Sequence, residues 1–375
     1  MKRTLRTIIH VLFFAYITIV SIVNIRPCDI PVFRYALERW PADSFQVYVL
    51  YRGSLSPDAQ ELVNWLDERS HRHISFSNYN LHVLDLADET NQAIAAWFEN
   101  ESETELPALI VRFPPHTGIQ TNILYTSLSA KTVQSIPDSP IRHEIAKRLL
   151  NGDSAVWVLL QSGKREKDES AARLLDEQLK KMEDQLQLPE TVVALANDLG
   201  EENGAASGLR IHFSSIHLSK TDAAEQLFLH TLMQSESDLH EYANEPMVFP
   251  IYGRGRILYA LVGAGIDDRN VLEAGAFITG PCSCEVKDLN PGLDMLIAVD
   301  WDGALEERFV DRIEEAFLLG TEPLKAEPPI EESEGEERIP LFTSLFRNLL
   351  LAVGILLVLN GVIAYKVLRK KTRMN

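Results

Sequence analysis

Residues 107–113 read PALIVRF, and residues 246–252 read PMVFPIY. In both segments a proline is followed at once by an apolar run of strand length, rich in β-branched and aromatic side chains. Such runs predict buried β-strands. Because this signal occurs in both halves of the chain, we expect one order of secondary-structure elements to be used twice.

The segments around residues 107–113 predict an α/β half. The run QVYVLY at residues 46–51 is typical of a strand, and Ser56 followed by Pro57 is a helix-start signal. Another proline, Pro140, opens a later helix. In chain order, the predicted elements are strand 46–51, helix 57–70, strand 81–86, helix 91–99, strand 108–113, strand 122–126 and helix 140–150.

The second half repeats this order. AVWVLL at residues 155–160 predicts a buried strand, and apolar residues at helical spacing predict a long amphipathic helix after it. The turn GRGR at residues 253–256 predicts a hairpin. The predicted elements are strand 155–160, helix 167–186, strand 209–215, helix 222–233, strands 247–252 and 257–262, and helix 270–278, followed by strand 295–300 and helix 305–319.

This order of elements, with a proline before the third strand, resembles the thioredoxin fold over residues 45–152 and 154–278. The resemblance implies an α/β fold of two tandem thioredoxin-like domains. Thioredoxin-like domains hold extended peptides beside that proline, so the resemblance also implies a peptide groove at Pro107 or Pro246.

The redox centre of the family is absent from the sequence. The family carries Cys-x-x-Cys at the turn from the first strand to the first helix. Here these turns read YRGSLS at residues 51–56 and QSGKR at residues 161–165, without cysteine. Because the thiolate is the nucleophile in disulfide exchange, we expect this chain to be redox-inactive.

Two apolar runs predict transmembrane helices that flank the domains: residues 7–25 (TIIHVLFFAYITIVSIVNI) and 348–365 (NLLLAVGILLVLNGVIAY). Each is about 20 residues long, enough to cross a bilayer. Lys2, Arg3 and Arg6 precede the first run and five Lys or Arg follow the second, and cationic flanks stay in the cytoplasm. We therefore predict a protein of the cell (inner) membrane with two spans, cytoplasmic termini, a periplasmic or otherwise extracytoplasmic body, and the lipid bilayer as a partner. A cleaved signal peptide is the alternative for the first run.

The charge of the body excludes nucleic acid as a partner. Eight of the 36 Lys and Arg lie in the two predicted cytoplasmic tails, so the rest of the chain carries 28 cationic residues against 54 Asp and Glu. The resulting charge of −26 repels phosphate backbones and anionic lipid head groups.

Composition divides the chain into segments. Residues 321–340 (TEPLKAEPPIEESEGEERIP) carry seven glutamates and five prolines or glycines and offer little to bury, so they predict a solvated linker. The predicted segments are a cytoplasmic tail and transmembrane helix at 1–26, the first thioredoxin-like domain at 27–152, the second domain with a C-terminal extension at 153–320, the acidic linker at 321–340, and a transmembrane helix with a basic tail at 341–375.

The chain has three cysteines, Cys28, Cys282 and Cys284. Thiols outside the cytoplasm tend to oxidise, so one hypothesis is a disulfide from Cys28 to Cys282 or Cys284. A second is that Cys282 and Cys284 bind a soft metal such as Cu(I) through two thiolates. A third is that they are small buried residues. The sequence leaves all three open.

No motif of the usual catalytic families occurs, so an enzyme is not expected. Acidic pairs such as Asp267 with Asp268 and Asp300 with Asp302 would allow an unrecognised hydrolase, but charges of this kind are usually solvated. The sequence therefore favours a cofactor-free accessory module that binds a membrane protein complex or an extracytoplasmic polypeptide. The alternative function is a thiol- or copper-handling membrane protein that uses Cys282 and Cys284.

Overall fold

The structure is a computed structural model. It describes residues 30–73, 76–101, 104–190, 192–193, 209–282, 286–305 and 309–311. These ranges fall in one compact unit, Met1–Pro323, and the second unit, Leu324–Asn375, lies outside them. No helix within the described ranges is long and apolar enough to cross a bilayer. Both predicted spans and the acidic linker lie outside the described residues.

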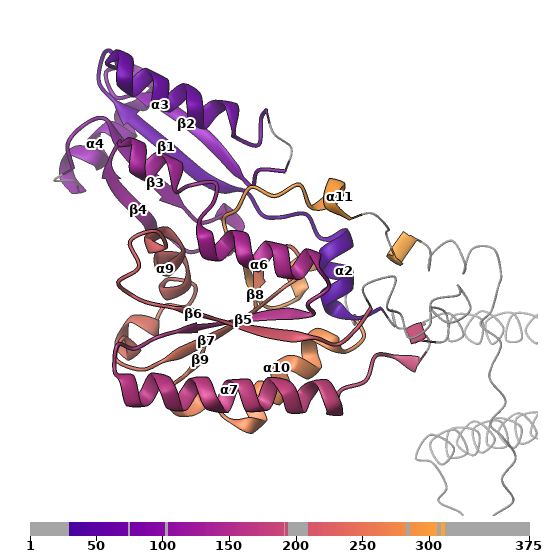
Figure 1. The fold of residues 1–375 in the computed structure, drawn as a ribbon. Coiled ribbons are helices and arrows are strands. Elements are labelled where there is room, and N and C mark those ends of the chain that lie inside the picture. Colours follow the sequence, from indigo (N-terminus) through magenta and orange to yellow (C-terminus); the bar gives the residue numbers. More distant parts are fainter. Residues whose placement is uncertain are drawn as a thin grey trace, which may run out of the picture. The chain divides into compact units, whose positions relative to one another are not determined.

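The first half forms a four-stranded mixed sheet of order β2-β1-β3-β4 (Figure 1). β2 pairs parallel to β1, and the remaining pairs are antiparallel. Its strands are β1 (Phe45–Tyr51), β2 (Tyr79–Asp85), β3 (Ala108–Arg112) and β4 (Asn122–Ser127), and its helices are α3 (Pro57–Glu68), α4 (Gln92–Glu101), α5 (Ala130–Gln134) and α6 (Pro140–Leu150).

The second half forms a six-stranded sheet of order β10-β8-β7-β5-β6, with β9 also paired to β7. Its core repeats the first sheet, since β6 is parallel to β5 and β7 is antiparallel to it. The strands are β5 (Ala155–Leu160), β6 (Phe213–Leu218), β7 (Met247–Tyr252), β8 (Arg256–Ile257), β9 (Leu261–Val262) and β10 (Leu293–Asp294). The helices are α7 (Arg165–Gln185), α9 (Gln226–Met233), α10 (Asp268–Thr279) and the short α11 (Trp301–Ala304).

The predicted α/β class with two similar sheets is confirmed, but three predicted strands are corrected. The strand predicted at 209–215 forms at 213–218, because an edge strand tolerates the polar Ser214, Ser215 and His217 within it. The strand predicted at 257–262 is interrupted. Ile257 pairs with Ile251 and Leu261 with Val248, which leaves one extra residue on the outer strand and makes a bulge.

The strand predicted at 295–300 is instead an extended segment between the two halves. Its backbone groups bond to scattered partners: the Met295 carbonyl accepts from Asn78 Nδ2 at 2.9 Å, and the Ile297 N–H donates to Asn78 Oδ1 at 2.7 Å. The Ala298 N–H donates to the Pro137 carbonyl at 2.8 Å. The segment is apolar and buried like a strand, but it has no continuous partner strand among the described residues.

Arg142 on α6 joins the same segment to the first half. Its side chain is 1% exposed and donates to the carbonyls of Leu296 and Ile136 and to Ser139 Oγ. Glu225, also 1% exposed, accepts from Ser139 Oγ at 2.6 Å. Burial lowers the pKa of the Arg142 guanidinium to about 10, so it stays charged at neutral pH. The two halves therefore meet through a buried polar network as well as through apolar contacts.

Three helices were missed by the sequence analysis: the short α5 and α11, and the longer α2. α2 (Val32–Arg39) precedes β1, yet its residues belong to the apolar core of the second half. The Val32 N–H donates to the Gly280 carbonyl at 3.0 Å. Glu38 is buried because its carboxylate accepts the N–H groups of Phe309 and Val310 at 3.0 and 2.8 Å.

Candidate functional site

The turns that carry the redox centre in thioredoxins are capped here by oxygen atoms. In the first half, Ser56 Oγ accepts the Ala59 N–H at 3.2 Å. In the second half, the buried carboxylate of Asp168 accepts the backbone N–H groups of Ser162 and Gly163 at 2.7 and 3.0 Å. Asp168 lies in the first turn of α7, where a helix start favours an acidic side chain. Oxygen atoms therefore accept the backbone N–H groups at both turns, as a helix cap in the first half and across the turn before α7 in the second.

One ion pair and one hydrogen bond connect the elements around the second turn. Lys167 pairs with Glu245, and Lys220 Nζ donates to the Ala243 carbonyl. Burial lowers the pKa of Lys220, and the nearby Asp168 charge partly offsets this effect. The first contact joins α7 to the segment before β7, and the second joins the segment after β6 to it.

The two prolines of the predicted peptide groove differ from each other. The Leu106–Pro107 bond is the one cis peptide bond among the described residues, so the bond before Pro246 is trans. Pro107 is half-buried, whereas Pro246 is buried and its carbonyl accepts the Gly263 N–H at 2.9 Å. Neither proline lines the clefts described below, and a groove at these positions stays a prediction.

Cys282 lies in the apolar core of the second half and is 1% exposed. Its N–H donates to the Ile30 carbonyl at 2.8 Å, at the start of the chain segment that leads into α2. Cys28 and Cys284 lie outside the described residues. Within the described ranges no group of three His, Cys, Asp or Glu side chains is placed to hold a metal ion. The disulfide and the copper site therefore remain predictions.

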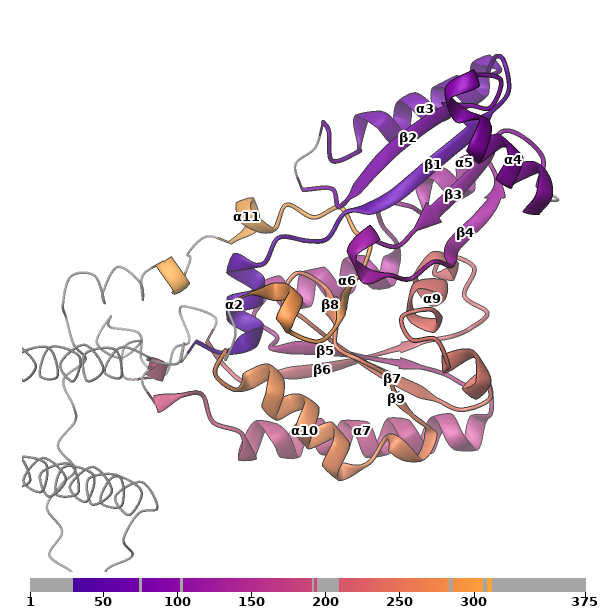
Figure 2. The same ribbon diagram turned by 180° about the vertical axis from the view of Figure 1, so that it is seen from behind.

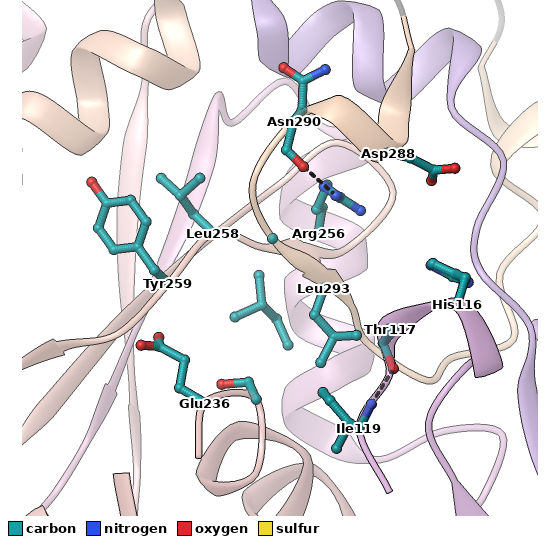
Figure 3. A pocket seen from close by; sticks show the side chains of 13 residues that line it. His116, Thr117, Ile119, Glu236, Arg256, Leu258, Tyr259, Asp288, Asn290 and Leu293 are labelled. Carbon is teal, nitrogen blue, oxygen red and sulfur yellow. Dashed lines mark hydrogen bonds between the residues drawn. The ribbon is translucent and has the colours of Figure 1, made fainter. Parts of the chain in front are cut away.

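A half-open cleft of about 470 Å³ lies where the two halves meet, and we call it the inter-sheet cleft. Figure 3 shows Tyr259 and Glu236 on one side of it and His116 and Asp288 on the other, with Leu293 between them. The cleft draws its lining from both halves of the chain, so no local sequence pattern could have predicted it.

One wall of the inter-sheet cleft is an incompletely paired edge of the second sheet. β10 covers only Arg256 and Ile257 of this edge. The Leu258 N–H donates to the Pro250 carbonyl of β7 at 2.9 Å, and Leu258 and Tyr259 continue this edge after β8 and line the cleft. The following N–H, that of Ala260, donates to Glu236 Oε1 at 2.8 Å. The pairing of this edge with β7 is thus interrupted at residues 258–260, between β8 and β9.

Arg256 lines the cleft, but its hydrogen bonds stay within the second half. The residue is 5% exposed, and its Nε and Nη2 atoms donate to the carbonyls of Pro291 and Asn290 at 3.1 and 2.9 Å. Its Nη1 atom donates to Asp294 Oδ1 at 3.1 Å. The carboxylate of Asp294 therefore largely neutralises the positive charge of Arg256.

An ion cluster behind this wall joins the start of β1 to the second half. Asp43 Oδ1 lies 2.8 Å from Lys287 Nζ, and the Asp43 N–H donates to Asp294 Oδ2 at 2.7 Å. His116 Nε2 lies 3.4 Å from Asp43 Oδ2 at the mouth of the cleft. Burial, and after it the charge of Asp294, raise the pKa of the Asp43 carboxyl, while Lys287 and His116 act in the opposite direction.

Two of the three hydroxyl groups in the lining donate to backbone carbonyls. Thr117 Oγ1 donates to the Pro114 carbonyl and Ser235 Oγ to the Leu232 carbonyl, both at 2.8 Å. Neither of these two hydroxyls donates to His116, whose Nε2 lies beside Asp43 instead. The cleft therefore offers an apolar floor, a sheet edge, and the exposed carboxylates of Glu236 and Asp288.

Comparisons with known proteins give no family. No protein-family model matches the chain, and no curated protein matches it. Among solved structures, the chain is similar to human ERp44 in its zinc-bound form, with 9% identity over 67% of this chain and 56% of that chain, at a TM-score of 0.21. It is also similar to the first two thioredoxin domains of Naumovozyma dairenensis Eps1p, with 11% identity over 59% of this chain and 85% of that chain, at a TM-score of 0.19. The match spans just over half of the ERp44 chain, and TM-scores this low do not assign a function to this chain.

Proposed function

We propose that this chain is a membrane-anchored accessory protein whose extracytoplasmic body binds a segment of another polypeptide. The body consists of two tandem thioredoxin-like domains without redox activity. The strand orders support this assignment, because in each sheet the second strand is parallel to the first and the third is antiparallel to it. The two spans predicted from the apolar runs provide the anchors.

The observation that carries the proposal is the sheet edge inside the inter-sheet cleft. An extended polypeptide can add to an exposed sheet edge through main-chain hydrogen bonds, with neighbouring pockets reading its side chains. Residues 257–259 of this edge line a cleft of about 470 Å³ with an apolar floor that includes Leu293. Glu236 and Asp288 are exposed beside it, so a segment with Lys or Arg fits the charge of the cleft.

A photocrosslinking side chain in place of Tyr259 tests this proposal in the full-length protein in its native membrane. The matched control is Tyr242, which is 45% exposed and does not line the cleft. We expect a covalent adduct with another polypeptide from position 259 and none from position 242. Asp288→Lys should reduce the adduct, because it repels a basic segment. Equal adducts from both positions, unchanged by Asp288→Lys, would show that the cleft is not the binding site.

The redox part of the proposal has its own test. The intact protein in mild detergent should reduce insulin disulfides no faster than buffer, because a serine hydroxyl or an aspartate carboxylate cannot exchange with a disulfide. Disulfide reduction that is lost on Cys282→Ser would instead support the thiol-handling alternative. The 1% exposure of Cys282 gives that alternative no support.

A further inference from the structure

A second half-open cleft, of about 280 Å³, lies on the outer face of the first sheet, and we call it the Trp97 cleft. Figure 2 shows α4 at one end of this sheet, beside β3 and β4. The cleft is lined from β1, β3 and α4 by Tyr48, Leu50, Ala93, Ile94, Trp97, Ile110 and Arg112. The inference below goes beyond the proposed function, and it does not depend on the inter-sheet cleft.

The cleft exists because α4 covers only part of the face. The register of the sheet places His82, Tyr48, Ile110 and Tyr125 in one row across the four strands. α4 packs over the neighbouring row through Phe98, which is 7% exposed, against Leu50 and Ala108. The Tyr48 row therefore lies at the margin of the helix, where its aromatic side chains are partly exposed.

Aromatic contacts hold the walls of the cleft in place. Trp97 stacks on Tyr125 with ring centroids 6.0 Å apart, and Tyr48 stacks on His82 at 4.7 Å. Trp97 nevertheless stays 39% exposed. Rigid aromatic side chains lose little conformational entropy on binding, and Trp, Tyr and Arg are the residues enriched at energetic hot spots of interfaces. The cleft combines all three types.

Arg112 gives the cleft a charge opposite to that of the body. Its Nη2 atom donates to the Gln120 carbonyl at 3.0 Å, and no carboxylate of the described residues lies within ion-pair distance of it. It is the one charged residue in the lining. A guanidinium with donors left over binds a carboxylate through paired hydrogen bonds.

We propose that the Trp97 cleft docks a partner polypeptide through one bulky apolar side chain that lies next to a carboxylate. The apolar side chain packs against Trp97, Tyr48 and Ile94, and the carboxylate of an aspartate, a glutamate or a chain terminus pairs with Arg112. This preference is opposite in charge to that of the inter-sheet cleft, so the two clefts recognise different segments.

A selection from a displayed library of random dodecapeptides, with the full-length protein in lipid nanodiscs as bait, tests the proposal. We expect enriched peptides to share an aromatic or long aliphatic residue within two positions of Asp, Glu or the peptide C-terminus. Trp97→Ala should weaken binding of the best selected peptide by about 30-fold, the size of a hot-spot loss. Tyr242→Ala, which removes another exposed aromatic ring, should leave it unchanged.

The charge-reversal variant Arg112→Glu should gain a new peptide preference, a result that a misfolded protein could not give. If Arg112 reads a carboxylate, selection on this variant should enrich Lys or Arg where the wild type enriched Asp or Glu. An unchanged motif on Arg112→Glu, binding that survives Trp97→Ala, or a selection that enriches no peptide would each overturn the proposal. Binding of 3-phenylpropionate as tight as that of any selected peptide would also overturn it, since the cleft would then be a small-molecule site.

Discussion

The two sheets share a strand order but differ in how they are covered. Every residue of β5 and β7 is buried, whereas buried and partly exposed residues alternate along most of β1, and β4 is mostly partly exposed. Figure 1 shows α7 and α10 on one side of the second sheet and α6 on the other. The same topology thus provides a covered scaffold in the second half and an accessible face in the first.

The difference arises from where the helices are used. The second sheet receives α2 from before β1 as well as its own α7 and α10, and these helices form one continuous apolar core. The outer face of the first sheet receives only α4 among the described residues, and its apolar cluster there is small. The helix that precedes β1 therefore packs on the second half and adds no cover to the outer face of the first sheet.

The largest expected effect concerns the attachment of α2 to the second half. Cys28 lies two residues before Ile30, whose carbonyl accepts the Cys282 N–H, and two residues of chain reach at most about 7 Å. We expect mass mapping without reduction to join a peptide containing Cys28 to one containing Cys282 or Cys284. A chain-entropy estimate for this loop of about 255 residues gives a stabilisation on the order of 5 kcal/mol. Three thiols that all alkylate in protein from its native compartment would exclude the bridge.

The next prediction compares a tryptophan in the covered second sheet with one at the accessible face of the first sheet. Trp157 on β5 is 0% exposed and Trp97 is 39% exposed. Trp157→Ala should lower the free energy of unfolding by about 3–5 kcal/mol, because it leaves a cavity in a covered core. Trp97→Ala should cost less than about 1 kcal/mol. Urea titrations of the intact protein in mild detergent, followed by pulse proteolysis, measure both. Equal losses would contradict the contrast between the sheets.

A somewhat smaller effect is expected at the junction of the halves. Arg142→Met should lower the free energy of unfolding by about 3 kcal/mol, because it removes four hydrogen bonds of the guanidinium and the positive charge near the buried Glu225. Arg148 on the same helix is the control, since its side chain is 31% exposed. Arg148→Met should cost less than about 1 kcal/mol. If Arg142→Met also splits unfolding into two transitions, the network couples the halves.

The order of the elements could be predicted because most strands are long apolar runs with clear start signals. The arrangement of α2 could not, since the apolar residues of VFRYALER do not encode which half they contact. The segment 295–300 is apolar enough for a strand, but its partners are single groups such as those of Asn78, more than 200 residues away. The local pattern of apolar residues predicts which side chains are buried. It does not predict which other element of the fold packs against them.

The candidate sites were harder to predict than the fold for the same reason. The inter-sheet cleft combines residues near positions 116, 236, 257 and 288, none of which stands in a recognisable motif. The Trp97 cleft did leave a signal. Trp97 and Phe98 are adjacent on one short helix, so they face different sides, and only one of them can enter the core under α4. Two neighbouring large aromatic residues on such a helix indicate that one stays accessible.

The smallest expected effect tests how the two halves are joined at the ion cluster. Burial and the charge of Asp294 raise the pKa of Asp43 above its ordinary 3.8, so near and above that pH the folded state binds more protons than the unfolded state. The free energy of unfolding should then fall with rising pH until Asp43 is ionised in the folded state as well.

The variant Asp43→Asn lacks this pH-dependent contribution. The stability of the wild type relative to Asp43→Asn should therefore decrease as the pH rises above about 4. Urea titrations of both proteins at a series of pH values from 4 upward measure the difference, with Asp176→Asn as a control on the exposed side of α7. A difference that grows with pH would mean that Lys287 and His116 outweigh burial, and that the junction holds Asp43 as a stabilising anion.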